Sequence, residues 1–295
     1  MASEPVITVK DLVCRFGDQT VLDGVDLDVE EGEVLVIMGG SGSGKSTLLR
    51  HMIGTFIPDG GTVSVFGDDL ASLDEDGMNK IRRQFGILFQ SGALFNSMSV
   101  ADNVALSLRE HTDLDPDIIE FIVKIKLEQV GLREAAAKFP AEISGGMKKR
   151  AGLARALALD PKLLFYDEPS AGLDPVTSAS IDQLILDLAK KAGTTSVVVT
   201  HEMDSAFVIA DRMAMLDKGK MLMIDKREAF ERLRDWPLEQ VDELDERQQL
   251  IRQFLRGDAE GPLTKRKEDS SYAEDLLGVE TPRLSRGPSV HSSKE

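Results

Sequence analysis

Apolar and polar residues alternate along two stretches near the N-terminus, residues 5–13 and 20–29. Such alternation is typical of antiparallel strands that are buried on one face. The run Val34–Met38 is apolar throughout, as expected of a strand buried on both faces. A glycine-rich turn follows, and a helical spacing of apolar residues begins at Lys45. The pattern therefore predicts an antiparallel β layer, then a buried strand, a turn and a helix.

The next part of the chain alternates strands with helices. Two further apolar runs, at 163–166 and 195–200, predict buried strands. Helical spacing of apolar residues predicts helices over 117–130, 145–159 and 175–192. This alternation is typical of an α/β fold with a mostly parallel core sheet, to which the N-terminal antiparallel layer is added.

The composition changes near residue 228. Residues 228–260 mix charged residues with spaced apolar ones, which indicates an amphipathic helix, placed at 239–256. Residues 261–295 have too little apolar surface to fold alone, and the tip after residue 279 is predicted to be disordered. The helix needs a second surface, and the sequence leaves open whether its own body or a partner protomer supplies it.

Composition and charge exclude several classes of protein. The 295 residues include 51 acidic and 35 basic side chains, a formal net charge of −16, and 42% hydrophobic residues. The hydrophobic fraction excludes a wholly disordered chain, and the acidic balance argues against a nucleic-acid partner. The single cysteine, Cys14, indicates a reducing compartment and is expected to be a packed strand residue. We expect neither a membrane-spanning helix nor a secretory signal, so a role at a membrane would require a partner.

Residues 39–46 read Gly-Gly-Ser-Gly-Ser-Gly-Lys-Ser and fit the phosphate-loop pattern G-x-x-x-x-G-K-[ST] between a predicted strand and a predicted helix. The glycines let the backbone approach a polyphosphate, and the N–H groups at the helix start face the anion. Lys45 is expected to reach the β- and γ-phosphates, and the Ser46 hydroxyl to ligate Mg²⁺. The predicted nucleotide-binding residues of this segment are Gly39, Gly40, Ser41, Gly42, Ser43, Gly44, Lys45, Ser46 and Thr47.

Two carboxylates follow the apolar run at 163–166, Asp167 and Glu168. The carboxyl end of a parallel strand lies at the ligand-binding edge of an α/β sheet. Asp167 is expected to hold the Mg²⁺ shell through water, and Glu168 to polarise the attacking water as general base. The pair is a weak signal alone and a strong one downstream of a phosphate loop.

A second candidate phosphate site is Ser144-Gly145-Gly146-Met147, which precedes a predicted helix. Ser144 fits the N-cap of that helix. Alternatively, its hydroxyl, the glycine N–H groups and the helix dipole bind a phosphate. One nucleotide does not need two such helix starts from one chain. Two chains arranged head to tail would each complete the other's site.

The order of these parts resembles that of the ATP-binding cassette (ABC) ATPases. Four further residues stand where the family's motifs place them: Phe16, Gln90, Asp174 and His201. The resemblance implies that Phe16 stacks on adenine, that Gln90 senses Mg²⁺ and the attacking water, and that His201 contacts the γ-phosphate. Asp174 ends the family's D-loop. The implied catalytic residues are Glu168, His201 and Gln90, and the implied Mg²⁺ ligands are Ser46, Gln90 and, through water, Asp167.

The resemblance also implies domains and cofactors. An ABC ATPase domain would cover 5–235, with a helical signature subdomain at about 92–160. Residues 236–279 would form a C-terminal helix and extension that docks on its own or the partner protomer, and 280–295 a disordered tail. ATP and Mg²⁺ are the implied cofactors. Met147 departs from the glutamine usual in the family, yet Ser144 and the backbone donors remain, so ATPase activity is expected to persist.

Several segments resemble more narrowly the ATPase of the Mla-type (maintenance of lipid asymmetry) phospholipid transporters. They are the phosphate loop, the Ser-Gly-Gly-Met signature and the segments 89–104, 108–111, 126–132, 252–262 and 272–277. This resemblance implies a homodimer beneath two copies of an integral membrane permease, peripheral to the cytoplasmic face of the inner membrane. The permease would exchange phospholipid with an MCE-domain protein, and a small STAS-domain protein often binds the ATPase in this family.

Other functions remain open at this point. The same ATPase could serve an amino-acid, metal or drug permease, although the signature and the C-terminal extension speak against it. A soluble ABC ATPase usually has coiled-coil insertions, zinc-binding cysteines or two cassettes, which this sequence lacks. A small-molecule P-loop kinase would leave Ser144-Gly145-Gly146 without a role.

Residues 91–98 are apolar yet directly follow Gln90. In the ABC family this region lies near the groove that receives a coupling helix of the permease. The alternative is that Leu94 and Phe95 are ordinary core residues.

Overall fold

The computed structural model describes residues 5–259, 261 and 262 and divides into two compact units. The first unit ends at Asp235 and the second begins at Trp236. The predicted tail, 280–295, lies outside the described residues, as does the extension beyond residue 262. Among the helices of the described part, none is both long enough and apolar enough to cross a membrane.

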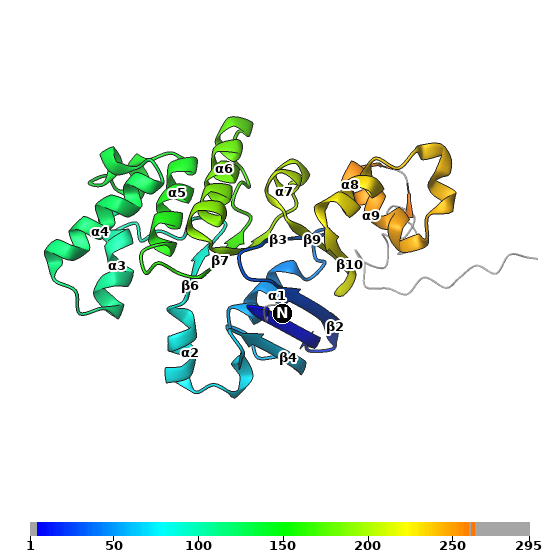
Figure 1. Ribbon diagram of the computed structural model, residues 1–295, viewed down its shortest axis with the longest axis horizontal. Coiled ribbons are helices and arrows are strands. Elements are labelled where there is room, and N and C mark those ends of the chain that lie inside the picture. Colours follow the sequence, from blue (N-terminus) through cyan, green and yellow to red (C-terminus); the bar gives the residue numbers. More distant parts are fainter. Residues whose placement is uncertain (1–4, 260, 263–295) are drawn as a thin grey trace, which may run out of the picture. The chain divides into compact units, whose positions relative to one another are not determined.

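An antiparallel sheet of four strands forms the N-terminal layer, in the order β2-β1-β4-β5 (Figure 1). Its strands are β1 (Ile7–Phe16), β2 (Gln19–Val29), β4 (Gly60–Val65) and β5 (Asp68–Asp69). In β1 the side chains of Ile7, Val9, Leu12 and Cys14 are buried, and a register shift accommodates the step from Val9 to Leu12. The predicted antiparallel layer is confirmed, and Cys14 is a packed strand residue as expected.

Six strands form the second sheet, in the order β10-β9-β3-β8-β7-β6. Its strands are β3 (Val34–Met38), β6 (Phe85–Leu88), β7 (Leu163–Asp167), β8 (Thr195–Val199), β9 (Arg212–Asp217) and β10 (Lys220–Lys226). Neighbouring strands pair in parallel, except that β9 and β10 are antiparallel. The predicted α/β class with a mostly parallel core sheet is confirmed.

The central strands are buried on both faces, which explains their unbroken apolar sequences. Every residue of β3 is at most 1% exposed. Leu35 and Ile37 share one apolar core with α1 and the antiparallel sheet. Because side chains alternate along a strand, Val36 and Met38 lie on the opposite face, where α5, α6 and α7 are found (Figure 1).

The helices of the first unit flank this sheet. Helices α3, α4 and α5 gather next to the β6 edge (Figure 1). The helices are α1 (Lys45–Met52), α2 (Glu75–Arg82), α3 (Val100–His111), α4 (Pro116–Gln129), α5 (Gly145–Ala156), α6 (Pro175–Ala192), α7 (Met203–Ile209) and α8 (Arg227–Arg234), with short 3-10 helices at Leu70–Ser72, Arg133–Ala135 and Pro140–Glu142. The helices predicted at 117–130, 145–159 and 175–192 agree with α4, α5 and α6 to within a few residues.

The single helix predicted at 239–256 is wrong as one element. The second unit instead has a 3-10 helix, η4 (Leu238–Glu243), and a separate α-helix, α9 (Glu246–Arg256). Asp245 starts the new helix through a capping box. Its carboxylate accepts the N–H of Gln248 at 2.8 Å, and its own N–H donates to the Gln248 side chain at 3.1 Å.

Candidate active site

Four parallel strands end at one edge of the core sheet, and each is followed by a predicted site residue. Gly39 follows β3, Gln90 follows β6, Glu168 follows β7 and His201 follows β8. The register places the last residues of neighbouring strands side by side. The carboxyl edge of a parallel sheet is where ligands bind in α/β folds. The fold thus gathers residues that are more than 160 positions apart in the sequence.

The phosphate loop, residues 39–46, depends on two glycines. Gly39 has φ +150° and Gly44 has φ +106°, conformations that L side chains rarely adopt. A Cβ atom on Gly39 would lie 2.1 Å from the carbonyl oxygen of Leu216. On Gly44 it would lie 2.8 Å from a methyl group of Leu22. Glycine at both positions is therefore a requirement of the loop's shape.

The loop places a cationic side chain and the start of a helix beside one cavity. Lys45 Nζ donates to the carbonyl oxygens of Gly39 at 2.8 Å and Gly40 at 2.9 Å. Gly44 caps α1 without a side-chain hydrogen bond, so the first N–H groups of the helix face a cavity of about 170 Å³ at the loop. A cationic side chain beside an uncapped helix start fits a polyphosphate.

The charged side chains around the phosphate loop have both signs. A lysine and two carboxylates lie close enough for their charges to act on the pKa values of Lys45 and Asp167. Burial lowers the pKa of Lys45, while Glu168 and Asp167 raise it. The pKa of Asp167 is raised by burial and then by the charge of Glu168. The exposed Ser46 hydroxyl and the Asp167 carboxylate are oxygen ligands of the kind that Mg²⁺ takes. In the described part, no three His, Cys, Asp or Glu side chains cluster to hold a metal.

Glu168 and His201 are in direct contact. His201 Nδ1 lies 2.8 Å from Glu168 Oε1. The other carboxylate oxygen accepts from Thr200 Oγ1 at 3.3 Å and from the His201 N–H at 3.4 Å. The Glu168 side chain is 13% exposed and that of His201 60% exposed. The carboxylate is therefore oriented by the loop that follows β8 and is mostly buried.

Lys149 is a site residue that the sequence reasoning missed. Its Nζ donates to the backbone carbonyl of Glu168 at 2.6 Å, and the residue is 4% exposed. Burial lowers its pKa, while Glu168 and Asp167 raise it. Three consecutive basic residues begin at Lys148, which suggests a solvated face. Only the helical period, with Gly146 also buried, separates the inward Lys149 from its neighbours.

The signature residues lie at the start of α5. Ser144 is the N-cap, and its hydroxyl accepts the Met147 N–H at 3.3 Å. Gly146 is packed so closely on α6 that a Cβ atom would lie 2.4 Å from Thr177 Cγ2. Asp174 caps α6 and accepts from the Thr177 N–H and hydroxyl, which lower its pKa. None of these residues lines the cavity at the phosphate loop of the same chain.

Phe16 lies at the end of β1 and is 51% exposed. Its ring meets Phe56 edge to face at a centroid distance of 5.7 Å. Arg50 lies over the other ring, 5.4 Å from its centroid. An aromatic ring that is half exposed and held from one side leaves a face free for stacking.

Comparison with known proteins decides the family. The model of the family described as ABC transporter matches residues 22–171, about half of the chain. The chain belongs to the ABC transporter family. It is an ATPase subunit of a transporter, as the phosphate loop and signature predicted.

Relatives of this ABC ATPase match it over most of its length. The intermembrane phospholipid transport system ATP-binding protein MlaF of Haemophilus influenzae is 38% identical over 275 residues, which cover 93% of this chain and 99% of the relative. MlaF of Escherichia coli is 39% identical over 92% of this chain and 96% of its own length. The probable ribonucleotide transport ATP-binding protein mkl of Mycobacterium leprae is 41% identical over 95% of this chain and 78% of its own length. The resemblance to Mla-type ATPases is confirmed, and the relatives' names state two different cargoes.

Solved ABC cassettes share the fold. The dimeric cassette MJ0796, in a post-hydrolysis state bound to ADP and Pi, has a TM-score of 0.69 and 31% identity over 75% of this chain and 98% of that chain. CbiO1 of Clostridium perfringens, part of the ABC transporter complex cbiONQ, has a TM-score of 0.71 and 27% identity over 82% of this chain and 98% of that chain.

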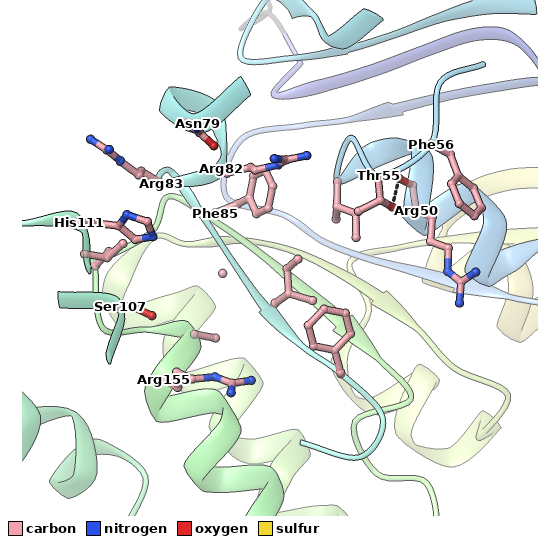
Figure 2. Close-up of a pocket in the computed structure, with 16 residues that line it drawn as sticks. Arg50, Thr55, Phe56, Asn79, Arg82, Arg83, Phe85, Ser107, His111 and Arg155 are labelled. Atoms are coloured by element: carbon pink, nitrogen blue, oxygen red, sulfur yellow. Dashed lines mark hydrogen bonds between the residues drawn. The ribbon is translucent and has the colours of Figure 1, made fainter. Parts of the chain in front are cut away.

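A groove of about 550 Å³ opens on this ABC ATPase (Figure 2), and one of its lining residues, Arg155, contacts the segment 91–98. Arg155 lines it from α5 and donates to the carbonyl oxygens of Gly92 at 3.2 Å and Ala93 at 2.7 Å. No acidic side chain is among the described residues that line the groove. Its basic lining residues are Arg50, Arg82, Arg83, His111 and Arg155.

Segment 91–98 itself is not ordinary core. Phe95 is 50% exposed and Leu94 only partly buried. The segment is held by Asn103, which is fully buried. The Asn103 Oδ1 accepts the Phe95 N–H at 2.8 Å, and its amide donates to carbonyl oxygens of the same turn. Sequence reasoning missed Asn103, whose only signal is an amide on the apolar side of a helix.

Proposed function

We propose that this chain powers phospholipid transport between inner and outer membrane, as a homodimer beneath two copies of an integral permease. An MCE-domain protein would receive or deliver the lipid, and a small STAS-domain protein would bind the ATPase. The chain would be peripheral, at the cytoplasmic face of the inner membrane. The observation that carries this proposal is the similarity over 99% of the length of a phospholipid transport ATP-binding protein, which continues past the cassette into the second unit.

In this proposal ATP and Mg²⁺ bind at the phosphate loop. Residues 39–47 surround the phosphates, and the exposed ring of Phe16 stacks on adenine. Ser46, Gln90 and a water on Asp167 complete the Mg²⁺ shell. The glycine cradle, the uncapped start of α1 and the oxygen donors support these assignments.

Glu168 is the general base of the proposed reaction. Its carboxylate would accept a proton from the water that attacks the γ-phosphate, while His201 contacts that phosphate and Gln90 senses the water. The contacts from Thr200 and His201 fix the carboxylate before substrate arrives, and fixed orientation is what a general base requires.

The second half of each site comes from the partner protomer. Ser144, Gly145, Gly146 and Met147 would face the nucleotide of the other chain, with Asp174 beside them. The absence of α5 from the lining of the phosphate-loop cavity supports this arrangement. ATP binding then closes the dimer, because the closed state binds ATP more tightly than the open one.

The groove in Figure 2 is the proposed seat of the permease. Arg50, Arg82, Arg83 and Arg155 form no ion pair with a carboxylate within the described residues, in a chain of net charge −16. Arginines without a carboxylate partner fit an incoming carboxylate. We therefore expect a cytoplasmic segment of the permease that carries at least one acidic side chain.

A second candidate function is ribonucleotide transport, the activity stated in the name of the mycobacterial relative. It uses the same ATPase and differs only in the permease and cargo. An amino-acid, metal or drug permease would differ in the same way. The partner, rather than the ATPase site, therefore discriminates among these functions.

The test is a pull-down of the tagged chain from gently solubilised native membranes, followed by mass spectrometry. We expect a permease together with an MCE-domain protein. Recovery of a nucleoside, amino-acid or metal permease instead would keep the ATPase and discard the lipid. Recovery of a STAS-domain protein alone would leave the permease assignment to a second pull-down through that protein.

A further inference from the structure

Three buried polar side chains connect elements next to the active site. Ser205 Oγ donates to Asp182 Oδ2 at 2.8 Å, and Ser170 Oγ lies 3.5 Å from Ser205 Oγ. Ser170 is 0% exposed, Ser205 6% and Asp182 5%. Water has little access to these groups, so each depends on the others for hydrogen bonding.

The direction of the two hydrogen bonds follows from the protons that the serine hydroxyls carry. The Ser205 hydroxyl has one proton, which it donates to the carboxylate. Ser170 is therefore the donor in the contact with Ser205. That contact is longer than an ordinary hydroxyl hydrogen bond of about 2.8 Å, so a small movement of Ser170 would close it.

These hydrogen-bonded side chains connect two loops of the active site. Ser170 lies two residues after Glu168, at the start of the D-loop. Ser205 lies in α7, four residues after His201. Asp182 lies in α6, the helix that begins where the D-loop ends, and α6 and α7 are neighbours in the fold (Figure 1). One carboxylate therefore connects to the loops on both sides of the Glu168–His201 contact.

We propose that Asp182 is a positioning residue for ATP hydrolysis, which holds Glu168 and His201 in their mutual geometry through Ser170 and Ser205. The proposal rests on the roles proposed above for Glu168 and His201. Closure of the Ser170–Ser205 contact would couple the D-loop to the loop that carries His201. A change at the D-loop, which would face the partner protomer in the proposed dimer, would then reach the catalytic carboxylate.

A purely structural role does not explain an acid at this position. Asp182 Oδ1 has no hydrogen-bond partner within the described residues. Burial of a half-satisfied carboxylate costs stability, and burial raises its pKa, with the charge of Glu202 adding to the shift. An amide or apolar side chain of similar size would be the better choice for stability alone.

The experiment compares ATP turnover of the full-length wild-type protein with that of variants in which one of the hydrogen-bonded residues is replaced. Asp182→Val and Ser205→Ala are each expected to lower kcat about tenfold, the scale of one lost hydrogen bond to a charged group, with KM for ATP within about twofold. Asp182→Asn retains an acceptor oxygen of the same shape, so its kcat should stay within about twofold of the wild type. Because both substitutions break the same series of hydrogen bonds, the double variant Asp182→Val/Ser205→Ala should be no slower than the slower single variant.

The matched control is Ser196→Ala. Ser196 is as buried as Ser170 but lies near the start of β8, at the opposite end of the strand from His201. Its loss should leave kcat unchanged. A loss as large as that of Ser205→Ala would mean that any buried serine lowers turnover, and would overturn the proposal.

Three further outcomes would also overturn it: normal kcat in Asp182→Val, an Asn variant as slow as the Val variant, or additive losses in the double variant. If Asp182→Val fails to fold, Ser205→Ala carries the test, because it removes one hydroxyl. Glu168→Gln separates this proposal from the site on which it rests. If that variant hydrolyses ATP normally, the site assignment fails, whereas if it is inactive and Asp182→Val is normal, only the positioning role fails.

Discussion

The backbone of Glu168 has φ +50°, a left-handed conformation that is uncommon outside glycine. Its N–H donates to the carbonyl of Val199 at 2.8 Å, and its carbonyl accepts from Lys149 at 2.6 Å. Such strain persists only where the surroundings hold the residue firmly, and it is frequent at active sites. At the residue scale, therefore, backbone and side-chain contacts together fix the direction of one carboxylate.

Glu168→Gln should bind ATP but hydrolyse it at least about 10²-fold more slowly, because the amide cannot accept the proton of the attacking water. Phosphate release and the binding of a fluorescent ATP analogue measure the two steps separately. Glu120→Gln, an exposed site on α4, is the matched control and should behave as wild type. Near-normal turnover of Glu168→Gln would remove this residue from the role of general base.

Residues that stand in a known motif could be singled out from the sequence, and residues outside the motifs that bind backbone atoms could not. Lys45 could be placed because it stands in a fixed pattern whose chemistry is local. Lys149 acts on the carbonyl of a residue 19 positions away, a contact that only the packing of α5 against the end of β7 creates. Asn103 likewise binds a turn eight positions earlier in the chain, and no sequence pattern near Asn103 predicts this contact.

Helix α5 meets α6 at a pair of small residues. Gly146 is buried, and Thr177 lies in the first turn of α6, where its hydroxyl donates to Asp174. This bond fixes the rotamer that directs the Thr177 methyl group toward Gly146. At the element scale, the signature helix α5 can approach α6 this closely because Gly146 has no side chain.

Gly146→Ala should lower the free energy of unfolding by about 1–3 kcal/mol, the usual cost of overpacking. The new Cβ atom would lie 2.4 Å from Thr177 Cγ2, and rotating Thr177 away would break its bond to Asp174. Adding Thr177→Ser removes that methyl group, keeps the hydroxyl and should recover most of the loss. Urea unfolding of the wild type and the two variants measures these changes, and an unrelieved loss in the double variant would place the strain elsewhere.

The contact of α6 with α7 predicts a pH-dependent stability. Burial and Glu202 raise the pKa of Asp182, and the Ser205 hydroxyl opposes that shift. A raised pKa means that Asp182 contributes stability when protonated, and that this contribution is lost as pH rises through its folded pKa. Asp182→Asn is always neutral, so its advantage in Tm over wild type should be larger at pH 8 than at pH 5. Calorimetry at the two pH values measures this, and an advantage that grows toward low pH would contradict it.

Elements with a strict apolar period were predicted accurately. The strand Val34–Met38 and the helix at 175–192 have the bounds that the sequence indicated. The helix at 239–256 was mispredicted because charged and apolar residues keep a helical spacing across Leu244, although Asp245 and Gln248 form a capping box that starts a new helix there. The amphipathic pattern alone does not reveal such an internal start.

At the scale of the whole molecule, the net charge does not show where basic and acidic side chains gather. A net charge of −16 argues against a nucleic-acid partner, yet the groove of Figure 2 is lined by arginines and by no described acidic residue. These side chains come from α1, the end of α2 and α5, which only the fold brings together. The total charge therefore argues against a broad nucleic-acid footprint and leaves room for a local site that binds carboxylates.

Arg83→Glu should abolish recovery of the permease in the pull-down, because it places a carboxylate where an incoming acidic side chain would dock. A like-charge contact and the loss of an arginine–carboxylate pair act in the same direction, and either alone is worth about tenfold or more in affinity at a desolvated site. Arg133→Glu, at an exposed site outside the groove, makes the same change in net charge and should leave recovery intact. ATP binding of both variants, measured alongside, shows that the nucleotide site is preserved. Equal recovery with Arg83→Glu and wild type would mean that the groove does not bind an acidic segment, and the permease would have to dock on another face of the cassette.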